Sequence, residues 1–190
     1  MINIEKMVQV CGYILKKYNG KLNYTKLIKL LYLADKEALK ESAVTISGDD
    51  YVCMPHGPVL TVIYDLIRNR YGHKDINAQA LWNTRFLSDS YDLITLISHY
   101  PEGKLSEYEK SVLDGVDNQY HNKGFGEMID LVHDRKICPE WRDPGDSSLP
   151  LPFAEVLKSV GYSDDEIKWA VAEREVFAEE EQRFDELKYL

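Results

Sequence analysis

Apolar residues recur at helical spacing in the first stretch of the chain. Between Ile4 and Tyr18 they return every three or four positions, and Asn19-Gly20 follows directly. Side chains with this spacing lie on one face of a helix, and an Asn-Gly pair favours the end of the helix. The pattern therefore predicts an amphipathic helix at the start of the chain.

The second apolar run, "YTKLIKLLYLADKEALK" at residues 24–40, spreads over a wider part of the helix surface. A wide apolar face is typical of a helix with several neighbours, so we expect this helix to be central. Asp35 interrupts the run and has two interpretations. Its carboxylate either faces solvent or pairs with Lys36 or Lys40, or it lies buried at the core edge and accepts N–H bonds from the turn at Gly57. In both interpretations its role is structural.

The pattern changes in "SGDDYVCMPHGPV", residues 47–59. Gly and Asp at 48–50 favour a turn, and the apolar run at 51–54 favours a short strand. Gly57 suits a helix N-cap, and Pro58 suits the first helical position, where a missing N–H costs nothing. The sequence therefore predicts a junction from strand to helix, with Gly57 and Pro58 as residues that determine the fold.

Residues 80–98 are rich in aromatic and branched side chains and are interrupted by Ser88-Asp89-Ser90. Such a pattern predicts a β-hairpin and hence a small antiparallel sheet, which the strand at 51–54 is a candidate to join. Ser106 and Glu109 then form a capping box ahead of a fourth helix. A shorter fifth helix is expected in "FGEMIDLVHD", residues 125–134.

The segment "CPEWRDPGDSSLPLP", residues 138–152, contains four prolines and is expected to cross the surface without regular structure. A short helix from Phe153 follows and ends at Gly161. Ser163 and Glu166 repeat the capping box before an acidic last helix with a weak apolar stripe. A weak stripe predicts a helix that docks loosely, or only against a partner.

These elements predict a mainly α fold, a compact single-domain helical bundle with a small antiparallel β-hairpin or sheet. A chain of 190 residues with 44% apolar residues is long enough for one substantial core. We expect a body at residues 1–145. Residues 146–190 form a Pro-rich connector and an acidic helical extension packed on or near that body.

The charge of the chain favours basic partners. The formal net charge is −9, of which −6 lies between Asp164 and Leu190, where ten acidic side chains face four basic ones. An acidic chain without a basic patch repels nucleic acid. Nucleic acid is therefore an unfavoured partner.

The chain carries no membrane-span or secretion signal. No apolar run reaches the length that a membrane span needs, and the start "MINIEKMVQV" lacks the pattern of a signal peptide. Three distant cysteines, an odd number, argue against a disulfide framework. We expect reduced thiols, no membrane contact and a cytoplasmic protein.

One constellation has the residue types of a zinc site. Cys53-x-x-His56 and the pair His133 and Cys138 would supply four ligands if the fold brought them together. Neither half has the spacing of a structural zinc site. The alternative places Cys53 in the core and His56 in the turn, and we assign no metal or cofactor.

A hydrolase could use His56 as a base with Asp35 and Asp65 as its orienting groups, or His133 with Asp134. No nucleophile lies in a recognisable motif, and no Gly-rich phosphate loop or H-E-x-x-H helix is present in the sequence. We therefore expect no catalytic residues and no enzyme. A metal-dependent hydrolase remains the weaker alternative.

Aromatic residues are candidate anchors for a protein partner, because large amphipathic rings dominate binding hot spots. Ordinary packing is the alternative, above all for the tryptophan in the Pro-rich segment. The candidate partner-binding residues are Tyr51, His56, Tyr64, Asp65 and Trp141.

The stretches "KLIKLLYLADKEAL" and "GDDYVCMPHGPVLTVIYDLI", followed by "LSEYEKSVLDGV", "LVHD" and "PEWRDP", together resemble the Panacea domain of the SocA-like antitoxin family. The resemblance covers residues 4–145 and, less closely, the helical end. It implies a mainly helical, cytoplasmic bacterial or phage protein that neutralises a cognate toxin by binding it. It supplies no catalytic or metal residue.

From the resemblance and the charge we expect an antitoxin whose partner is a basic protein toxin. Because one family member resembles a proteolytic adaptor, the alternative is delivery of the toxin to a cytosolic AAA+ protease. The toxin itself, its contact surface and the oligomeric state do not follow from the sequence.

Overall fold

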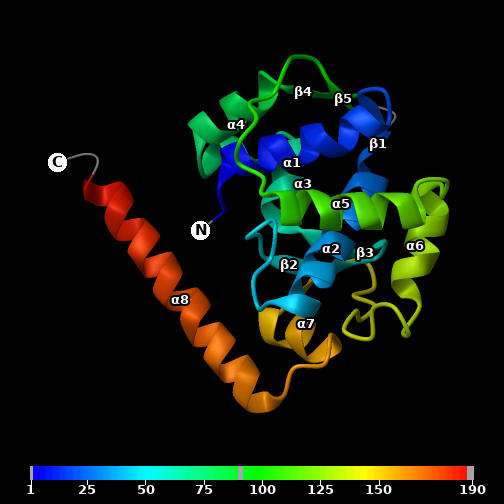
Figure 1. The fold of residues 1–190 in the computed structure, drawn as a ribbon. Helices are drawn as coiled ribbons and strands as arrows, with labels where there is room; N and C mark the ends of the chain where they lie inside the picture. The colour runs from blue at the N-terminus through cyan, green and yellow to red at the C-terminus, as the bar shows by residue number, and fades with distance from the viewer. Residues whose placement is uncertain (1, 90–91, 188–190) are drawn as a thin grey trace.

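Helix α2 (Tyr24–Glu41) runs through the middle of the molecule in the computed structural model, which describes residues 2–89 and 92–187 (Figure 1). The Asn23 side chain caps it by accepting hydrogen bonds from the backbone N–H groups of Thr25 and Lys26. Helices α3, α5 and α6 and strands β1 and β3 all contact it. The prediction of a central helix is confirmed.

Helix α1 (Ile4–Lys17) begins at the predicted position. The side-chain oxygen Oδ1 of Asn3 accepts a hydrogen bond from the Lys6 N–H at 2.9 Å, which caps the first turn. After the helix, Asn19 and Gly20 both have positive φ, at 55° and 80°. These residue types adopt that conformation most readily, so the predicted end is also confirmed.

Strands β1 (Lys21–Asn23), β5 (Leu93–Leu96) and β4 (Phe86–Ser88) form an antiparallel sheet in the order β1-β5-β4. The predicted hairpin is confirmed over β4 and β5. The first residues of the predicted range instead belong to helix α4 (Ile76–Asn83), and the third strand is β1, not residues 51–54. Both of these details of the prediction are wrong.

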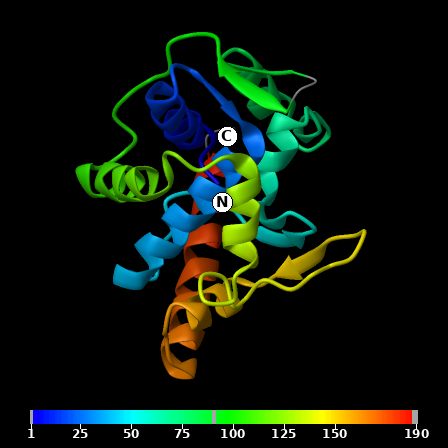
Figure 2. The same cartoon turned by 90° about the vertical axis from the view of Figure 1, so that its right-hand side faces the viewer.

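Residues 51–54 form strand β2 (Tyr51–Met54) of a second antiparallel sheet, in the order β3-β2-β6. Its neighbours are β3 (Gly57–Leu60) and β6 (Leu149–Leu151), one on each side, and Figure 2 shows the gold β6 beside the β2–β3 hairpin. Met54 pairs with Gly57, so Pro55 and His56 form a two-residue hairpin turn. Because β2 has a partner on each side, it has no free edge for the other sheet.

The predicted strand-to-helix junction is therefore wrong. Gly57 and Pro58 begin a strand, and helix α3 (Thr61–Ile67) starts at Thr61. Gly57 has φ +99°, which other residues adopt only with strain, and a Cβ there would lie 2.3 Å from Val132 Cγ2. Gly57 thus lies in a hairpin turn packed against another helix, and that it determines the fold stays a prediction.

The other helices follow in chain order: the 3₁₀ turn η1 (Tyr71–His73), α5 (Glu107–Tyr120), α6 (Phe125–His133), α7 (Phe153–Ser159) and α8 (Asp164–Leu187). Both predicted capping boxes are present. The Ser106 N–H donates to Glu109 at 2.9 Å, and the Ser163 N–H donates to Glu166 at 2.8 Å. The mainly α fold with minor antiparallel β structure is confirmed.

The Pro-rich segment holds one strand that the sequence did not predict. Leu149 pairs with Cys53, and Leu151 pairs with Tyr51. Pro150 is tolerated because β6 is an edge strand, where an N–H is not required on the outer side. The expectation of no regular structure is therefore wrong at this point of the segment.

Charged side chains of α2 are buried and hold other segments in place. Lys36 pairs with Glu140 at 2.7 Å, and Glu140 also accepts a hydrogen bond from the Tyr32 hydroxyl. The Lys29 ammonium group donates to the Pro58 carbonyl at 2.7 Å. Burial lowers the pKa of Lys29 to about 7 and raises that of Tyr32. These contacts fix the hairpin and the Glu140 segment against the central helix.

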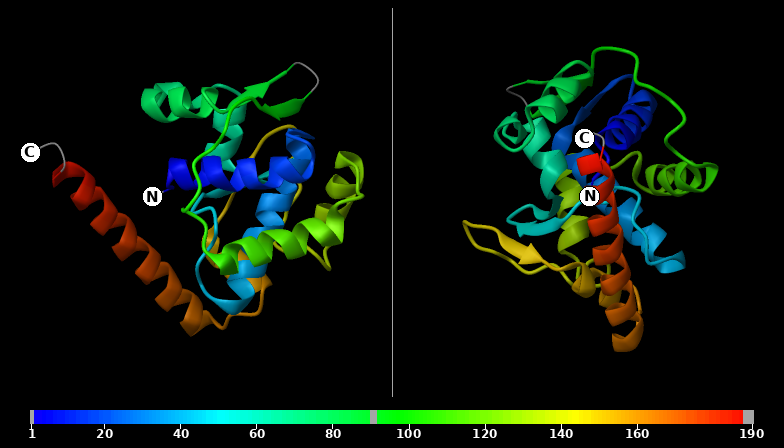
Figure 3. Two further views of the ribbon diagram at one scale, coloured as in Figure 1. Left: turned by 45° about the horizontal axis from the view of Figure 1, so that its top comes forward. Right: turned by 90° about the vertical axis from the view of Figure 1, so that its left-hand side faces the viewer.

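Helix α8 packs on the body through its first half, as far as Arg174. In Figures 1 and 3 its first turns lie next to α7, and the outer half of the helix stands away from the body. Ile167 and Ala170 are buried, with exposed fractions of 9% and 3%. Phe177, further along, is 58% exposed. The predicted stripe is present at these positions, but the body covers only part of it.

Candidate functional site

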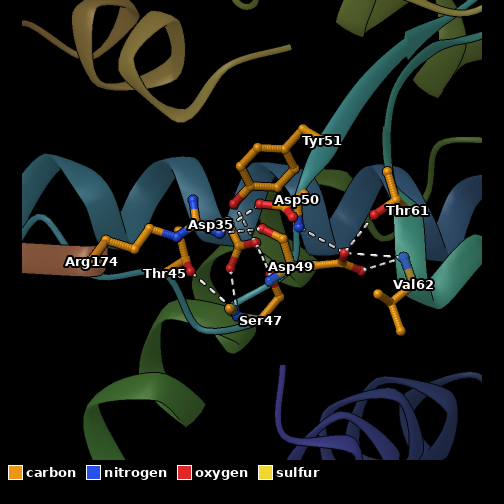
Figure 4. A network of polar contacts seen from close by, with 10 residues as sticks. Asp35, Thr45, Ser47, Asp49, Asp50, Tyr51, Thr61, Val62 and Arg174 are labelled. Carbon is orange, nitrogen blue, oxygen red and sulfur yellow. Dashed lines mark hydrogen bonds and ion pairs between the residues drawn. The ribbon is translucent and has the colours of Figure 1, made fainter. Parts of the chain in front are cut away.

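A buried polar network lies where the loop after α2 meets the start of α3 (Figure 4). Asp35 of α2 accepts hydrogen bonds from the Ser47 N–H at 2.9 Å, from the Ser47 hydroxyl and from the Tyr51 hydroxyl at 2.8 Å. Burial raises the pKa of Asp35, and these hydrogen bonds act in the opposite direction. Its carboxylate thus holds the loop after α2 against the helix.

Asp49, in the same loop, caps helix α3 from outside the helix. Its carboxylate accepts hydrogen bonds from the N–H groups of Val62 and Ile63, at 3.0 to 3.1 Å, and from the Thr61 hydroxyl at 3.0 Å. The N–H groups of Val62 and Ile63 belong to the first helical turn and have no partner inside the helix. Burial nonetheless raises the pKa of Asp49 to about 6.

Arg174 connects helix α8 to this network. Its guanidinium donates to the Asp49 carbonyl oxygen and to the Asp50 carboxylate, both at 3.0 Å (Figure 4). The same group lies 4.5 Å from the centre of the Phe153 ring, in cation–π range. Arg174 therefore joins three segments: α8, the loop after α2 and the start of α7.

A groove of about 700 Å³ lies beyond this contact, between α8 and the body. Val44, Val62 and Tyr71 are apolar and aromatic residues of its body wall. Phe177 and Ala178 belong to the α8 wall. Pockets of this size, with apolar walls and a few polar groups, are typical of binding sites.

The rim of the groove is acidic. Asp50 and Glu173 line it, and the Asp50 side chain is 85% exposed although it pairs with Arg174. The rest of α8 adds further acidic side chains, because ten acids and three basic residues lie between Asp164 and Leu187. An apolar floor with an acidic rim suits a partner that is both apolar and basic.

Comparison with known proteins gives one match. The family model of the SocA-like antitoxins, the Panacea domain, matches residues 27–142. The chain belongs to this family. No curated protein and no solved structure matches it. The match confirms the resemblance over residues 27–142, which include most of the central helix, the hairpins of both sheets and helices α3 to α6. Helix α1 and strand β1 precede the matched residues, and β6, α7 and α8 follow them.

Two predicted partner residues lie together on the Panacea domain. His56, exposed at the hairpin turn, and Tyr64 of α3 both line a small pocket of about 230 Å³. Asp65 lies in the next position of α3 and pairs with Lys74 at 3.1 Å. That these residues contact a partner stays a prediction.

Two other candidates lie elsewhere. Tyr51 is 4% exposed and donates its hydroxyl hydrogen to Asp35, so it belongs to the core and not to a surface. Trp141 is half-buried, stacks on His133 with ring centres 4.0 Å apart, and donates from Nε1 to the Met54 carbonyl. Trp141 thus packs against the β2–β3 hairpin, which is the ordinary packing expected as the alternative to partner binding.

Of the two interpretations of Asp35, the buried one is correct, but the hydrogen-bond donors that it predicted are not. It is buried, so the solvent-facing or lysine-paired interpretation is wrong. Its donors are Ser47 and Tyr51, however, and not the turn at Gly57. The Ser47 N–H, in the loop after α2, binds the carboxylate.

The zinc constellation does not assemble. Among residues 2–89 and 92–187, no three His, Cys, Asp or Glu side chains lie close enough together to hold a metal ion. Cys53 is buried and accepts a hydrogen bond from the Arg142 N–H at 3.5 Å. His133 stacks on Trp141, and burial and the Lys29 charge lower its pKa.

No helix within the same described residues is long and apolar enough to cross a membrane.

Sequence reasoning missed the residues that matter most at the groove, which are Asp49, Asp50 and Arg174. One signal was available: Arg174 is a cation on the apolar stripe of an acidic helix. A cation in that position indicates an anionic group on the surface against which the helix packs. The identity of that group requires the fold, because Arg174 and Asp50 lie 124 positions apart.

Proposed function

We propose that this protein is an antitoxin that neutralises a cognate toxin by binding it directly in the cytoplasm, without catalysis. Membership of the SocA-like antitoxin family supports a role in a toxin–antitoxin system. The observation that carries the proposal of direct binding is the groove between α8 and the body, whose walls are apolar and whose rim is acidic. Such a surface fits a basic protein better than a nucleic acid.

Binding would block the toxin by covering its active surface. An apolar centre excludes water and supplies most of the affinity, whereas a charged rim speeds encounter with a partner of opposite charge. Both features occur here: Val44 and Phe177 are exposed apolar residues at the groove, and Asp50 and Glu173 line its rim.

The test is a growth assay. Each protein encoded beside this one is expressed alone and together with this chain. We expect one of them to arrest growth alone and to be harmless together with this chain, and the two proteins to copurify. If none of the toxic neighbours is neutralised, the proposal is wrong.

The same assay separates direct inhibition from delivery to a protease. Direct inhibition predicts that the amount of toxin stays constant when this chain is present. Delivery predicts that the toxin disappears, and that it returns when the host lacks one cytosolic AAA+ protease.

A further inference from the structure

The inner face of α8 carries three apolar and two charged residues at the spacing that helix packing requires. The residues of α8 that line the groove are Ala170, Glu173, Arg174, Phe177 and Ala178. Counted from the first, they lie at i, i+3, i+4, i+7 and i+8, which is the pattern of a helix face in contact with a neighbour. Along this face, exposure rises from 3% at Ala170 to 58% at Phe177. The helix thus extends its packing face beyond the body that it packs against (Figure 3).

The opposite wall of the groove also carries apolar residues, beside the polar Thr45 and the acidic Asp49 and Asp50. Val44 lies there, 65% exposed, with Val62 and Tyr71. Exposed apolar side chains on two facing walls gain free energy when a third apolar surface fills the space between them. A helix is a suitable occupant, because side chains on the faces of one helix can contact apolar residues on both walls.

The acidic charge around the groove favours a basic helix over an acidic one as its occupant. Arg174 is already bonded to the Asp49 carbonyl and paired with Asp50, whereas the acids of α8 outnumber its basic residues by ten to three between Asp164 and Leu187. A second copy of this chain would bring another acidic α8 against the first, which like-charge repulsion opposes. A basic occupant meets charge of the opposite sign at the rim.

We propose that the groove between α8 and the body binds a basic amphipathic helix of the toxin, so that α8, the toxin helix and the body form three packed layers. This inference rests on the proposed function and specifies its contact surface. Phe177 supplies the central apolar contact, and Glu173 and the neighbouring acids of α8 contact the basic face of the bound helix.

The test uses the full chain and a model peptide. The probe is a helical peptide of leucine and lysine, with leucine at helical spacing. A peptide of the same composition in scrambled order and a leucine and glutamate peptide are the controls.

Phe177→Asp removes the apolar contact in the groove. Val176→Asp is the matched variant, because Val176 is the adjacent residue, is 54% exposed, and does not line the groove.

We expect the helical basic peptide to bind, and the scrambled and acidic peptides to bind at least about tenfold more weakly. Phe177→Asp should weaken binding by at least about tenfold, and Val176→Asp by less than about twofold. Equal effects of the two variants, or equal binding of the scrambled peptide, would overturn the inference. If the unmodified chain self-associates and Phe177→Asp abolishes this self-association, the inference is also overturned, because the occupant of the groove is then a second copy of the chain.

The growth assay keeps the two proposals distinguishable. If the parent neutralises a neighbouring toxin and Phe177→Asp does so equally well, the groove is not the contact surface, although the antitoxin function stands. If the peptide binds in the groove and no toxin is neutralised, the groove binds basic helices but the antitoxin function fails.

Discussion

Helices α2 and α8 are both rich in charge, but they use it in opposite ways. In α2, the charged side chains of Lys26, Lys29, Asp35 and Lys36 are all buried and hydrogen-bonded. In α8 most of the charged side chains that the structure describes are at the surface, and Arg174 forms hydrogen bonds with the loop after α2. Buried charge specifies which segments pack together, whereas surface charge remains available to a partner.

This difference separates the residues that determine the fold from those proposed to bind a toxin. The charged groups of α2 reach segments far away in sequence, for example Glu140, which lies 104 positions from Lys36. The acids of α8 mainly face solvent. Substitutions should therefore change stability in one region and binding in the other.

The largest effect is expected at Glu140. Glu140→Ala leaves the Lys36 ammonium group buried without its carboxylate and the Tyr32 hydroxyl without its acceptor. Loss of one partner of a buried pair costs about 3–5 kcal/mol, so urea denaturation should show a loss of that size. Asp165→Ala on α8 is the control, because this acid is 95% exposed and pairs only with Lys168 at 3.3 Å. A similar loss in both variants would remove the distinction between the helices.

The next effect concerns two glycines with nearly the same φ. Gly57 has φ +99° and Gly161, between α7 and α8, has φ +104°. A Cβ at Gly57 would collide with Val132, whereas a Cβ at Gly161 would meet no atom within 4 Å. Gly57→Ala should therefore cost about 2–4 kcal/mol, strain plus overpacking, and Gly161→Ala about 1 kcal/mol, strain alone. Equal costs in thermal unfolding would show that the packing of Gly57 on α6 has no energetic role.

A smaller effect is expected from Lys29, and it depends on pH. Its pKa in the folded chain is about 7, below the ordinary value of 10.5, so the unfolded chain binds more protons between these values. Stability should therefore rise as the pH increases above about 7, by about 2–3 kcal/mol up to pH 9. Lys29→Met keeps the volume of the side chain and removes the titrating group. The variant should lack this rise in urea denaturation; the same rise in both proteins would contradict the burial of a titrating Lys29.

Local patterns predicted most helices, because caps and apolar spacing act within a few residues. The capping boxes at Ser106 and Ser163 and the stop at Gly20 are examples. Gly57 shows where this reasoning fails. Gly-Pro fits the start of a helix as well as a hairpin turn, and Val132 and Lys29, from other helices, decide between them.

Local sequence patterns predicted less of the candidate site than of the fold. Its acidic and apolar composition was visible in the last helix, but the groove requires the loop after α2 to meet α8. Arg174 and the Asp49 backbone, 125 positions apart, make that contact. Residues chosen for their type alone, such as Tyr51, were therefore placed wrongly at the surface.

Hydrogen–deuterium exchange of the intact protein tests the central claim most directly, because it compares α2 and α8 in one sample. Amides of α2 should exchange only when the whole protein unfolds, with the free energy of opening that denaturation gives. Amides of α8 beyond Phe177 should exchange at least about a thousandfold faster, because the backbone of that part of the helix stands away from the body in Figure 1. Equal protection of the two helices would contradict the claim that α2 determines the fold and that the outer half of α8 is left for a partner.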